Sequence, residues 1–198
     1  MQGIVSLLDG ASERAVRALW AELETRHGLC EAPRRMPFPH CSYQIVAEYD
    51  LAALGALLPR VAAQHAPFSV VVSGLGAFET PEPVLYLAVQ RNAALDALHA
   101  ALWRALVAGG VAREWSPLYA PGSWIPHITL AQLDLTLEGL RAIQSAWADR
   151  DLRREVQFSG LTLGGQAPEE AAQRPLLRFP LGSGESDQES GQVGDPAN

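Results

Sequence analysis

The strings Pro39-His40-Cys41-Ser42 and Pro126-His127-Ile128-Thr129-Leu130 are the stretches that decide the fold of this chain of 198 residues. Each string is Pro-His with a hydroxyl residue two positions after the histidine. Each also opens a run of residues that is typical of a strand. Around both strings the pattern of apolar and turn residues predicts the same order of elements: strand, helix, strand, helix, strand.

In the first half, the predicted elements are separated by residues that stop or start helices. We expect one helix to end at Gly28 and the next to be capped by Asp50, with Pro59 as a residue that shortens or kinks it. The Pro-rich connector over 31–39 is predicted to be non-helical, because proline disrupts a helix interior. The predicted elements are strand 3–8, helix 12–26, strand 40–48, helix 50–64 and strand 68–73.

The second half repeats this order and adds a short strand at its end. We interpret Gly74 and Gly76, which lie near the junction of the halves, as turn residues. A long loop precedes the strand that starts at Pro126. The predicted elements are strand 84–90, helix 92–108, strand 126–133, helix 136–148, strand 155–163 and an edge strand over 176–181.

Together these elements predict an α+β fold with two lobes. The lobes are pseudo-symmetric strand-helix-strand-helix-strand repeats, about 3–75 and 83–163, with mostly antiparallel sheets around a central cleft. We expect residues 1–181 to form this domain. From 182 to 198 the chain is rich in Gly, Ser, Asp, Glu and Gln, which predicts a disordered acidic tail. The pseudo-twofold relation brings the two middle strands, and with them the two histidines, together.

The composition is typical of a globular protein, with 48% hydrophobic and 19% charged residues. No stretch approaches the roughly 20 apolar residues that span a bilayer, so we expect a cytoplasmic monomer without membrane contact. The formal net charge of -7 argues against long duplex nucleic acid as a partner, but it is compatible with a short or terminal phosphate. Cys30 and Cys41 are too few for a disulfide framework or a cysteine metal site, and we expect free thiols.

Side chains two residues apart on a strand point to the same face, so His40 joins Ser42 and His127 joins Thr129 on the face away from the helices. Breaking a phosphodiester needs a base, an acid and donors for the non-bridging oxygens, which two imidazoles and two hydroxyls supply. Cys41 points to the opposite face, so we reject it as a nucleophile. No matched motif provides the third ligand that a zinc site would need.

The paired strings His40-Cys41-Ser42 and His127-Ile128-Thr129, each within a strand-helix repeat, resemble the two-histidine (2H) phosphoesterase superfamily, in particular its 2'-5' RNA ligase-like members. The resemblance implies chemistry on 2',5'-linkages or 2',3'-cyclic phosphates of RNA ends or small nucleotides, without a metal or other cofactor. It assigns His40 and His127 as the acid/base pair and Ser42 and Thr129 as phosphate-binding donors. Where several members carry a basic residue after the second motif, this chain has Gln132, and its first motif is the less usual serine version.

Positive charge for a phosphate must then come from elsewhere, and the loops that enter the two motif strands contain arginines. Aromatic residues of the second loop are suited to stacking on a base, although Trp124 is equally suited to packing. The candidate substrate-binding residues are Arg34, Arg35, Arg113, Tyr119 and Trp124.

Histidines outside the two motifs are interpreted as structural or surface residues, because His27, His65 and His99 have no hydroxyl partner in this pattern.

The leading hypothesis is a phosphoesterase that acts on RNA termini or on small cyclic or 2',5'-linked nucleotides. Two alternatives stay open. One is a nucleotide- or RNA-end-binding module with the same fold but little catalysis, and the other is a scaffold protein in which both motifs are vestigial.

Overall fold

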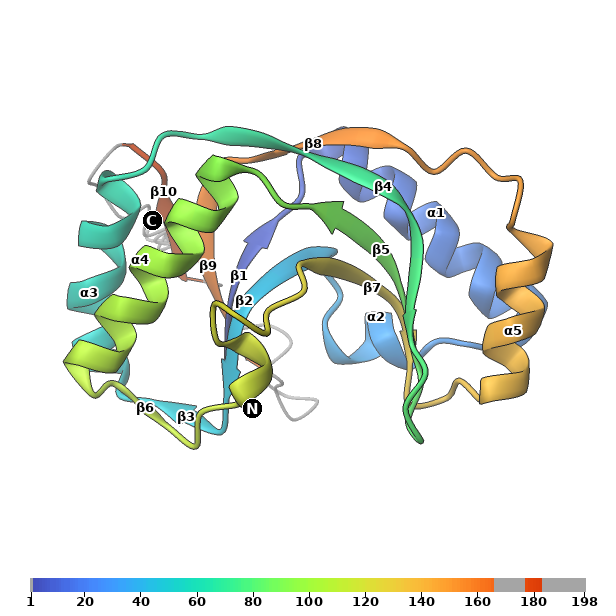
Figure 1. The fold of residues 1–198 in the computed structure, drawn as a ribbon, viewed down its shortest axis with the longest axis horizontal. Coiled ribbons are helices and arrows are strands. Elements are labelled where there is room, and N and C mark those ends of the chain that lie inside the picture. The colour runs from blue at the N-terminus through green and yellow to red at the C-terminus, as the bar shows by residue number, and fades with distance from the viewer. Residues whose placement is uncertain (1, 166–176, 183–198) are drawn as a thin grey trace, which may run out of the picture.

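Two antiparallel sheets of four strands each form the centre of the protein (Figure 1). The structure is a computed structural model and describes residues 2–165 and 177–182. The strands of the two sheets are β1 (Gln2–Leu7), β2 (His40–Val46), β4 (Phe68–Phe78), β5 (Val84–Gln90), β7 (His127–Gln132), β8 (Arg154–Phe158), β9 (Gly160–Gly165) and β10 (Leu177–Pro180). The first sheet has the order β10-β9-β1-β2 and the second has the order β7-β5-β4-β8. The predicted α+β class is confirmed.

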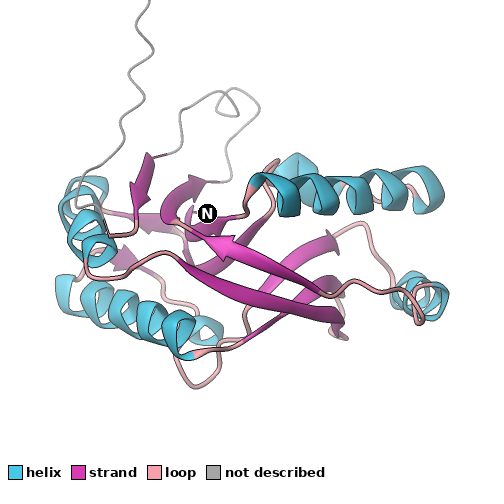
Figure 2. Cartoon of the chain, turned by 90° about the horizontal axis from the view of Figure 1, so that it is seen from above, coloured by secondary structure: helices cyan, strands magenta, loops and turns pink. Residues whose placement is uncertain are grey.

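Of the helices, the longer ones lie at the two ends of the molecule with the strands between them, and the shortest lies between these ends beside β7 (Figures 1 and 2). They are α1 (Gly10–His27), α2 (Glu31–Arg35), α3 (Leu51–Ala63), α4 (Ala93–Gly109) and α5 (Leu137–Ala146), with a 3-10 turn η1 (Pro117–Tyr119). Helices α3 and α4 pack against each other, and α3 contacts β9 and β10 of the first sheet. Helix α1 contacts β7 of the second sheet. A two-stranded ladder of β3 (Glu48–Tyr49) and β6 (Ala112–Arg113) completes the fold.

The predicted helix boundaries at Gly28 and Asp50 are confirmed. Gly28 ends α1 in the left-handed conformation, with φ at 72°. The Asp50 side chain caps α3 by accepting a hydrogen bond from the backbone N–H of Ala53. Helix α3 continues through Pro59 to Ala63, so the proline does not shorten it. Burial of neighbouring apolar side chains such as Leu58 stabilises the last turn.

Strand membership crosses the two halves of the sequence. Strand β4 ends the first half, yet it pairs with β5 and β8 in the second sheet. Strand β9 ends the second half, yet it pairs with β1 in the first sheet. Each sheet therefore contains strands from both halves, and the buried side chains of both sheets belong to one continuous core.

The predicted strand over 155–163 is wrong as a single element. It is two strands, β8 and β9, which break at Ser159 and belong to different sheets. Apolar residues occur on both sides of the break, with Val156 and Phe158 buried before it and Leu161 buried after it, so the local sequence does not reveal that the hydrogen-bonding partner changes. Gly160 starts the new strand where a Cβ atom would lie 3.1 Å from the Phe179 carbonyl oxygen of β10.

Gly74 and Gly76 lie inside β4, so their prediction as turn residues is wrong. The ladder between β4 and β5 shifts register between Val72 and Gly74, where Gly74 has φ at 147°. Gly76 lies directly under the ring of Tyr86, with no room for a Cβ atom. The two glycines thus allow a bulge and a close approach inside a strand.

The connector over 31–39 contains a helical turn, so its prediction as entirely non-helical is wrong. Helix α2 spans Glu31–Arg35 and includes Pro33. Proline is tolerated there because the first N–H groups of a helix have no partner within the helix. Only the segment after α2, with Pro37 and Pro39, is extended into β2.

Two further predictions concern the C-terminal part of the chain. Strand β10 pairs with β9 at the edge of the first sheet, as predicted. The predicted acidic tail over 182–198 lies, apart from Gly182, outside the described residues. Within the described ranges, none of the helices combines the length and the apolar character needed to cross a bilayer.

Two glycine substitutions test this packing in opposite directions. We expect G76A to destabilise the protein by roughly 1–3 kcal/mol, because the new methyl group displaces the Tyr86 ring. We expect G55A to stabilise it by about 0.5–1 kcal/mol, because Gly55 lies inside α3 with open space around it. Urea unfolding measures both. Equal effects of the two variants would contradict the close approach at Gly76.

Candidate active site

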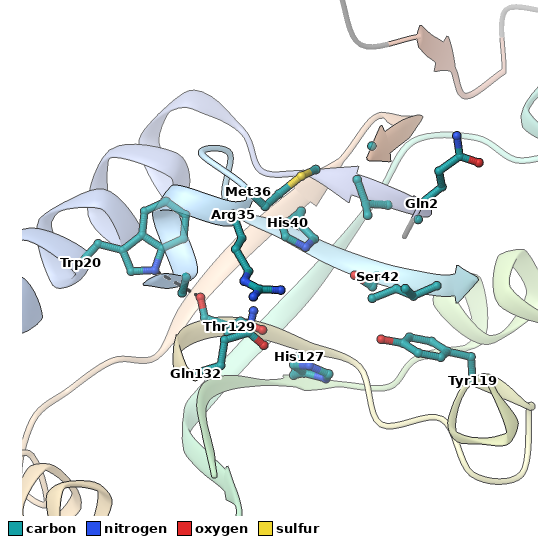
Figure 3. Close-up of a pocket in the computed structure, with 15 residues that line it drawn as sticks. Gln2, Trp20, Arg35, Met36, His40, Ser42, Tyr119, His127, Thr129 and Gln132 are labelled. Atoms are coloured by element: carbon teal, nitrogen blue, oxygen red, sulfur yellow. Dashed lines mark hydrogen bonds between the residues drawn. The ribbon is translucent and has the colours of Figure 1, made fainter. Parts of the chain in front are cut away.

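The two motif strands adjoin where the two sheets meet. Strand β2 is the edge of the first sheet and β7 is the edge of the second, and the two strands contact each other. Each begins with its histidine, His40 or His127. The predicted approach of the two middle strands is therefore present in the structure, and Figure 3 shows side chains from both strands around one cavity.

Each motif strand has a β-bulge three residues after its histidine, where it carries one residue more than the strand with which it pairs. In the β1–β2 ladder Val5 pairs with Ser42 and Ile4 with Gln44, which leaves Tyr43 unpaired. The β5–β7 ladder has the same shift, three residues after the second histidine.

In that second ladder Tyr86 pairs with Thr129 and Leu85 with Ala131, which leaves Leu130 unpaired. Bulges of this kind twist a strand and change the direction of its side chains. After each bulge the cavity is lined by the residue five positions after the histidine, Ile45 in β2 and Gln132 in β7.

Trp20 and Trp124 donate hydrogen bonds to the two bulged strands in a reciprocal way. The indole N–H of Trp124, from the second half, donates to the Ser42 carbonyl at 2.9 Å. The indole N–H of Trp20, from the first half, donates to the Thr129 carbonyl at 3.2 Å. Each half therefore supplies the donor that satisfies the motif backbone of the other half.

All four motif side chains line one cavity of about 180 Å³, which corresponds to the volume of about six water molecules. Arg35 and Tyr119 line it as well, and Figure 3 shows the Arg35 side chain directed from α2 toward Thr129. Arg35 is the one permanently charged group among the described lining residues. The cavity thus brings together two imidazoles, two hydroxyls and one guanidinium.

Both histidines are oriented by the same local hydrogen bond. Nδ1 of His40 bonds the Phe38 carbonyl at 2.8 Å, and Nδ1 of His127 bonds the Ile125 carbonyl at 2.7 Å. A carbonyl only accepts, so Nδ1 carries the proton in both rings. Nε2 is then the nitrogen that is left for a ligand. It accepts a proton when the ring is neutral and donates one when the ring is charged.

Burial lowers the pKa of both catalytic candidates. For His40 the bond to the Phe38 carbonyl opposes this shift, and the nearby charge of His127 lowers the pKa further. For His127 the bond to the Ile125 carbonyl opposes the effect of burial on the pKa. Two neighbouring imidazoles do not readily carry charge at the same time, so the site readily holds at most one protonated ring.

Cys41 and Tyr119 keep their protons in this environment. Burial raises the pKa of the Cys41 thiol to about 12, so it is not a thiolate nucleophile near neutral pH. Burial also raises the pKa of Tyr119 to about 12, which keeps its hydroxyl a hydrogen-bond donor. Over residues 2–165 and 177–182, no three His, Cys, Asp or Glu side chains come close enough to hold a metal ion.

A second, more apolar groove of about 350 Å³ continues from the cavity past His127. It shares Tyr119, His127 and Gln132 with the cavity. Phe78 packs edge-on against the His127 ring, with centroids 5.2 Å apart. Leu118 and Ile125, which are 71% and 52% exposed, both line the groove, so its rim carries exposed apolar side chains.

Comparison of the sequence with known families agrees with this geometry. The profile described as the 2'-5' RNA ligase superfamily matches residues 10–166. The chain belongs to the 2'-5' RNA ligase superfamily. The match includes both histidine motifs, and it confirms the family that the two strings resemble. No curated protein sequence matches the chain.

Solved structures of similar fold come from two bacteria. TT0787 of Thermus thermophilus is similar with a TM-score of 0.60 and 17% identity, over 91% of this chain and 97% of that one. Escherichia coli LigT complexed with NADP+ is similar with a TM-score of 0.53 and 15% identity, over 91% and 93% of the two chains. LigT complexed with 3'-AMP gives 0.53 and 16% identity, over 91% and 94%. These likenesses show that the chain has the LigT-like fold.

The candidate substrate-binding residues of this superfamily member are placed differently from one another. Arg35 and Tyr119 line the cavity, whereas exposed Arg34 pairs with Glu31 on α2 at 3.3 Å. The backbone of Arg113 pairs with Glu48 in the β3–β6 ladder. Trp124, which also borders the groove, is 3% exposed and stacks on His99 with ring centroids 3.9 Å apart, so the structure favours the packing alternative for it.

Some residues around the site of this superfamily member were not predicted from the sequence. Trp20 carries only the signal of a core residue, because it lies on the apolar face of α1. Phe78 gives no signal, because it lies beyond the predicted end of its strand. His99, interpreted as structural, bonds the Tyr119 carbonyl through Nε2 at 3.0 Å and so supports the loop that borders the cavity.

Nuclear magnetic resonance can test the tautomers and the pKa directions of the two histidines. We expect both neutral rings to be protonated at Nδ1 and both to titrate below the ordinary value of about 6.5, because burial disfavours the imidazolium. Long-range ¹H–¹⁵N spectra across pH, in a buffer without phosphate, measure this. The urea-unfolded chain is the reference. A folded-state pKa above that reference for either ring would contradict the burial argument.

Proposed function

We propose that this protein is a phosphoesterase that acts on 2',3'-cyclic phosphate or 2',5'-phosphodiester linkages of RNA ends or small nucleotides by two-histidine acid/base catalysis. One observation carries the proposal. His40 and His127, from opposite halves of the chain, line one cavity, and each has Nδ1 engaged by a backbone carbonyl so that Nε2 is available. Membership of the 2'-5' RNA ligase superfamily supports the same reaction class.

In this mechanism the two imidazoles exchange one proton through the substrate. Toward a 2',3'-cyclic phosphate, the neutral ring removes a proton from water, and the water oxygen forms a new bond to phosphorus. The bond from phosphorus to one ribose oxygen breaks, and the charged ring donates a proton to that oxygen. Ser42, Thr129 and Arg35 bind the non-bridging oxygens, which stabilises the charge of the transition state. The reverse sequence would form the linkage.

The neighbouring groove suits the base of the same nucleotide. Its lining combines Tyr119 with the apolar side chains of Phe78 and Leu118, and it opens directly from the cavity beside His127. A flat aromatic base is stabilised by such surfaces through stacking and burial. Escherichia coli LigT, which has this fold, was solved in complex with NADP+ and with 3'-AMP, and both ligands contain a base and a phosphate.

Replacement of either histidine tests the proposal directly. We expect H40A and H127A each to lower turnover of adenosine 2',3'-cyclic phosphate by roughly 10²–10⁴-fold, because each removes an acid or a base. Product formation is measured by chromatography with EDTA present, since the proposed mechanism uses no metal ion. The control H27A, at the exposed end of α1, is expected to match the wild type. Unchanged turnover in both active-site variants would end the assignment.

The same experiment separates the proposal from its alternative. A wild-type chain that binds 3'-AMP tightly but turns over none of the cyclic or 2',5'-linked substrates is a binding module with the same fold. Binding without loss in H40A and H127A would support that alternative further, because catalysis is then not the role of the imidazoles.

A substitution at the groove tests the position of the base. We expect L118A to raise KM for adenosine 2',3'-cyclic phosphate about fivefold, since loss of apolar contact costs about 1 kcal/mol. KM for ribose 2',3'-cyclic phosphate, which has no base, is expected to stay constant. V107A is the matched control, because Val107 is also exposed but lies on α4 and does not line the groove. Equal KM changes for both substrates would place the base elsewhere.

A further inference from the structure

The carboxylate of Asp134 joins the end of β7 to the start of α2. Its Oδ2 accepts hydrogen bonds from the backbone N–H groups of Cys30 at 2.6 Å and Glu31 at 2.8 Å. The first N–H groups of a helix have no partner within the helix, and α2 has no side-chain cap of its own at Cys30. Asp134 therefore replaces the missing local cap from a distant part of the chain.

Asp134 is closely tied to the strand that carries the second motif. It follows Gln132, the last residue of β7, by two positions, and the residue between them is Leu133 with φ at 74°. A leucine rarely adopts this left-handed conformation, which costs roughly 1–3 kcal/mol. The other carboxylate oxygen, Oδ1, is buried and has no hydrogen-bond partner among the residues that the structure describes. The strained turn thus directs one carboxylate oxygen to α2.

Arg35 lies at the opposite end of the same short helix. Helix α2 also places Ala32 and Met36 on the wall of the active-site cavity. No carboxylate among the described residues forms a salt bridge with Arg35, so its guanidinium is free to meet an anion. The chain contains no lysine, which makes arginine the sole source of permanent positive side-chain charge. The position of the Arg35 guanidinium in the cavity is therefore set by the backbone of α2.

We propose that Asp134 is a positioning residue, which anchors α2 to β7 so that Arg35 meets a phosphate held between the motif strands. This inference rests on the function proposed above. Through this contact, the strand that carries His127 and Thr129 also sets the distance between the guanidinium of Arg35 and a phosphate bound in the cavity. A guanidinium binds phosphate through N–H groups that lie in one plane. These donors reach two phosphate oxygens together only when the backbone that carries the arginine is held in place.

A double-mutant cycle between Asp134 and Arg35 tests the inference. The variants are D134A, R35Q and the double variant, and the readouts are KM for adenosine 2',3'-cyclic phosphate and Kd for inorganic phosphate by calorimetry. We expect D134A to raise both constants about tenfold with less than a twofold change in kcat. In the R35Q background, D134A is expected to add less than twofold, because the group it positions is gone.

Two further variants separate positioning from general damage. D134N retains an oxygen acceptor for the two N–H groups and is expected to restore KM to within about twofold of the wild type. D50A removes the side-chain cap of α3 and is expected to leave KM and Kd unchanged. If D134A does not fold, D134S, which keeps a shorter acceptor, takes its place in the cycle.

The inference is overturned by any of three results. These are equal effects of the Asp134 change with and without Arg35, equal effects of D50A and D134A, and absence of phosphate binding by the wild type. Failure of the proposed function looks different, because the wild type would then bind phosphate without turnover. The calorimetric cycle decides the role of Asp134 in that case as well, since it requires no catalysis.

Discussion

The carbonyl groups of Ser42 and Thr129 are the constraint on which the active site depends. Each lies at a bulge of its motif strand, where the regular ladder is interrupted, and each accepts from a tryptophan of the opposite half. A buried carbonyl without a donor costs about 1–3 kcal/mol, so the two indoles fix the relative position of the halves. The hydroxyls of the same two residues are directed into the cavity as a consequence.

The charge and the size of the cavity both favour a small anion over an extended one. The chain has a formal net charge of -7, which disfavours an extended polyanion, yet its cavity holds one guanidinium beside two titratable rings. Burial lowers the pKa of both rings, and a bound phosphate would favour the charged form of one of them. A phosphate bound in the cavity would therefore change the charge state of the two histidines.

The sequence predicted those features that depend on local patterns. Both motif strands, the end of α1 at Gly28 and the cap of α3 at Asp50 follow from residue types over a few positions. The role of Asp134 could not be predicted, because the helix it caps lies far earlier in the chain. The sequence also cannot tell which of the neighbours Arg34 and Arg35 lines the cavity, because that depends on the direction in which α2 points each side chain.

The local sequence pattern also cannot predict which strands pair with one another. Alternation describes which side of a strand is buried, but not which strand lies next to it, so the sequence predicts a single strand where the structure has β8 and β9 in different sheets. Gly74 and Gly76 were assigned to a turn because glycine is common in turns. Only the ring of Tyr86 and the register shift in β4 reveal why glycine is needed there.

Because β4 and β9 each pair with strands of the other half, neither half of the chain contains a complete sheet. Separated halves would leave the first sheet without β9 and β10 and the second sheet without β4, so each half could complete its core only by exchanging strands with another chain. The present chain has the connectivity of a domain-swapped dimer whose two subunits are fused. Cutting it between β4 and β5 should therefore yield fragments that fold only on each other, and His40 and His127 would share one cavity only in the reassembled product.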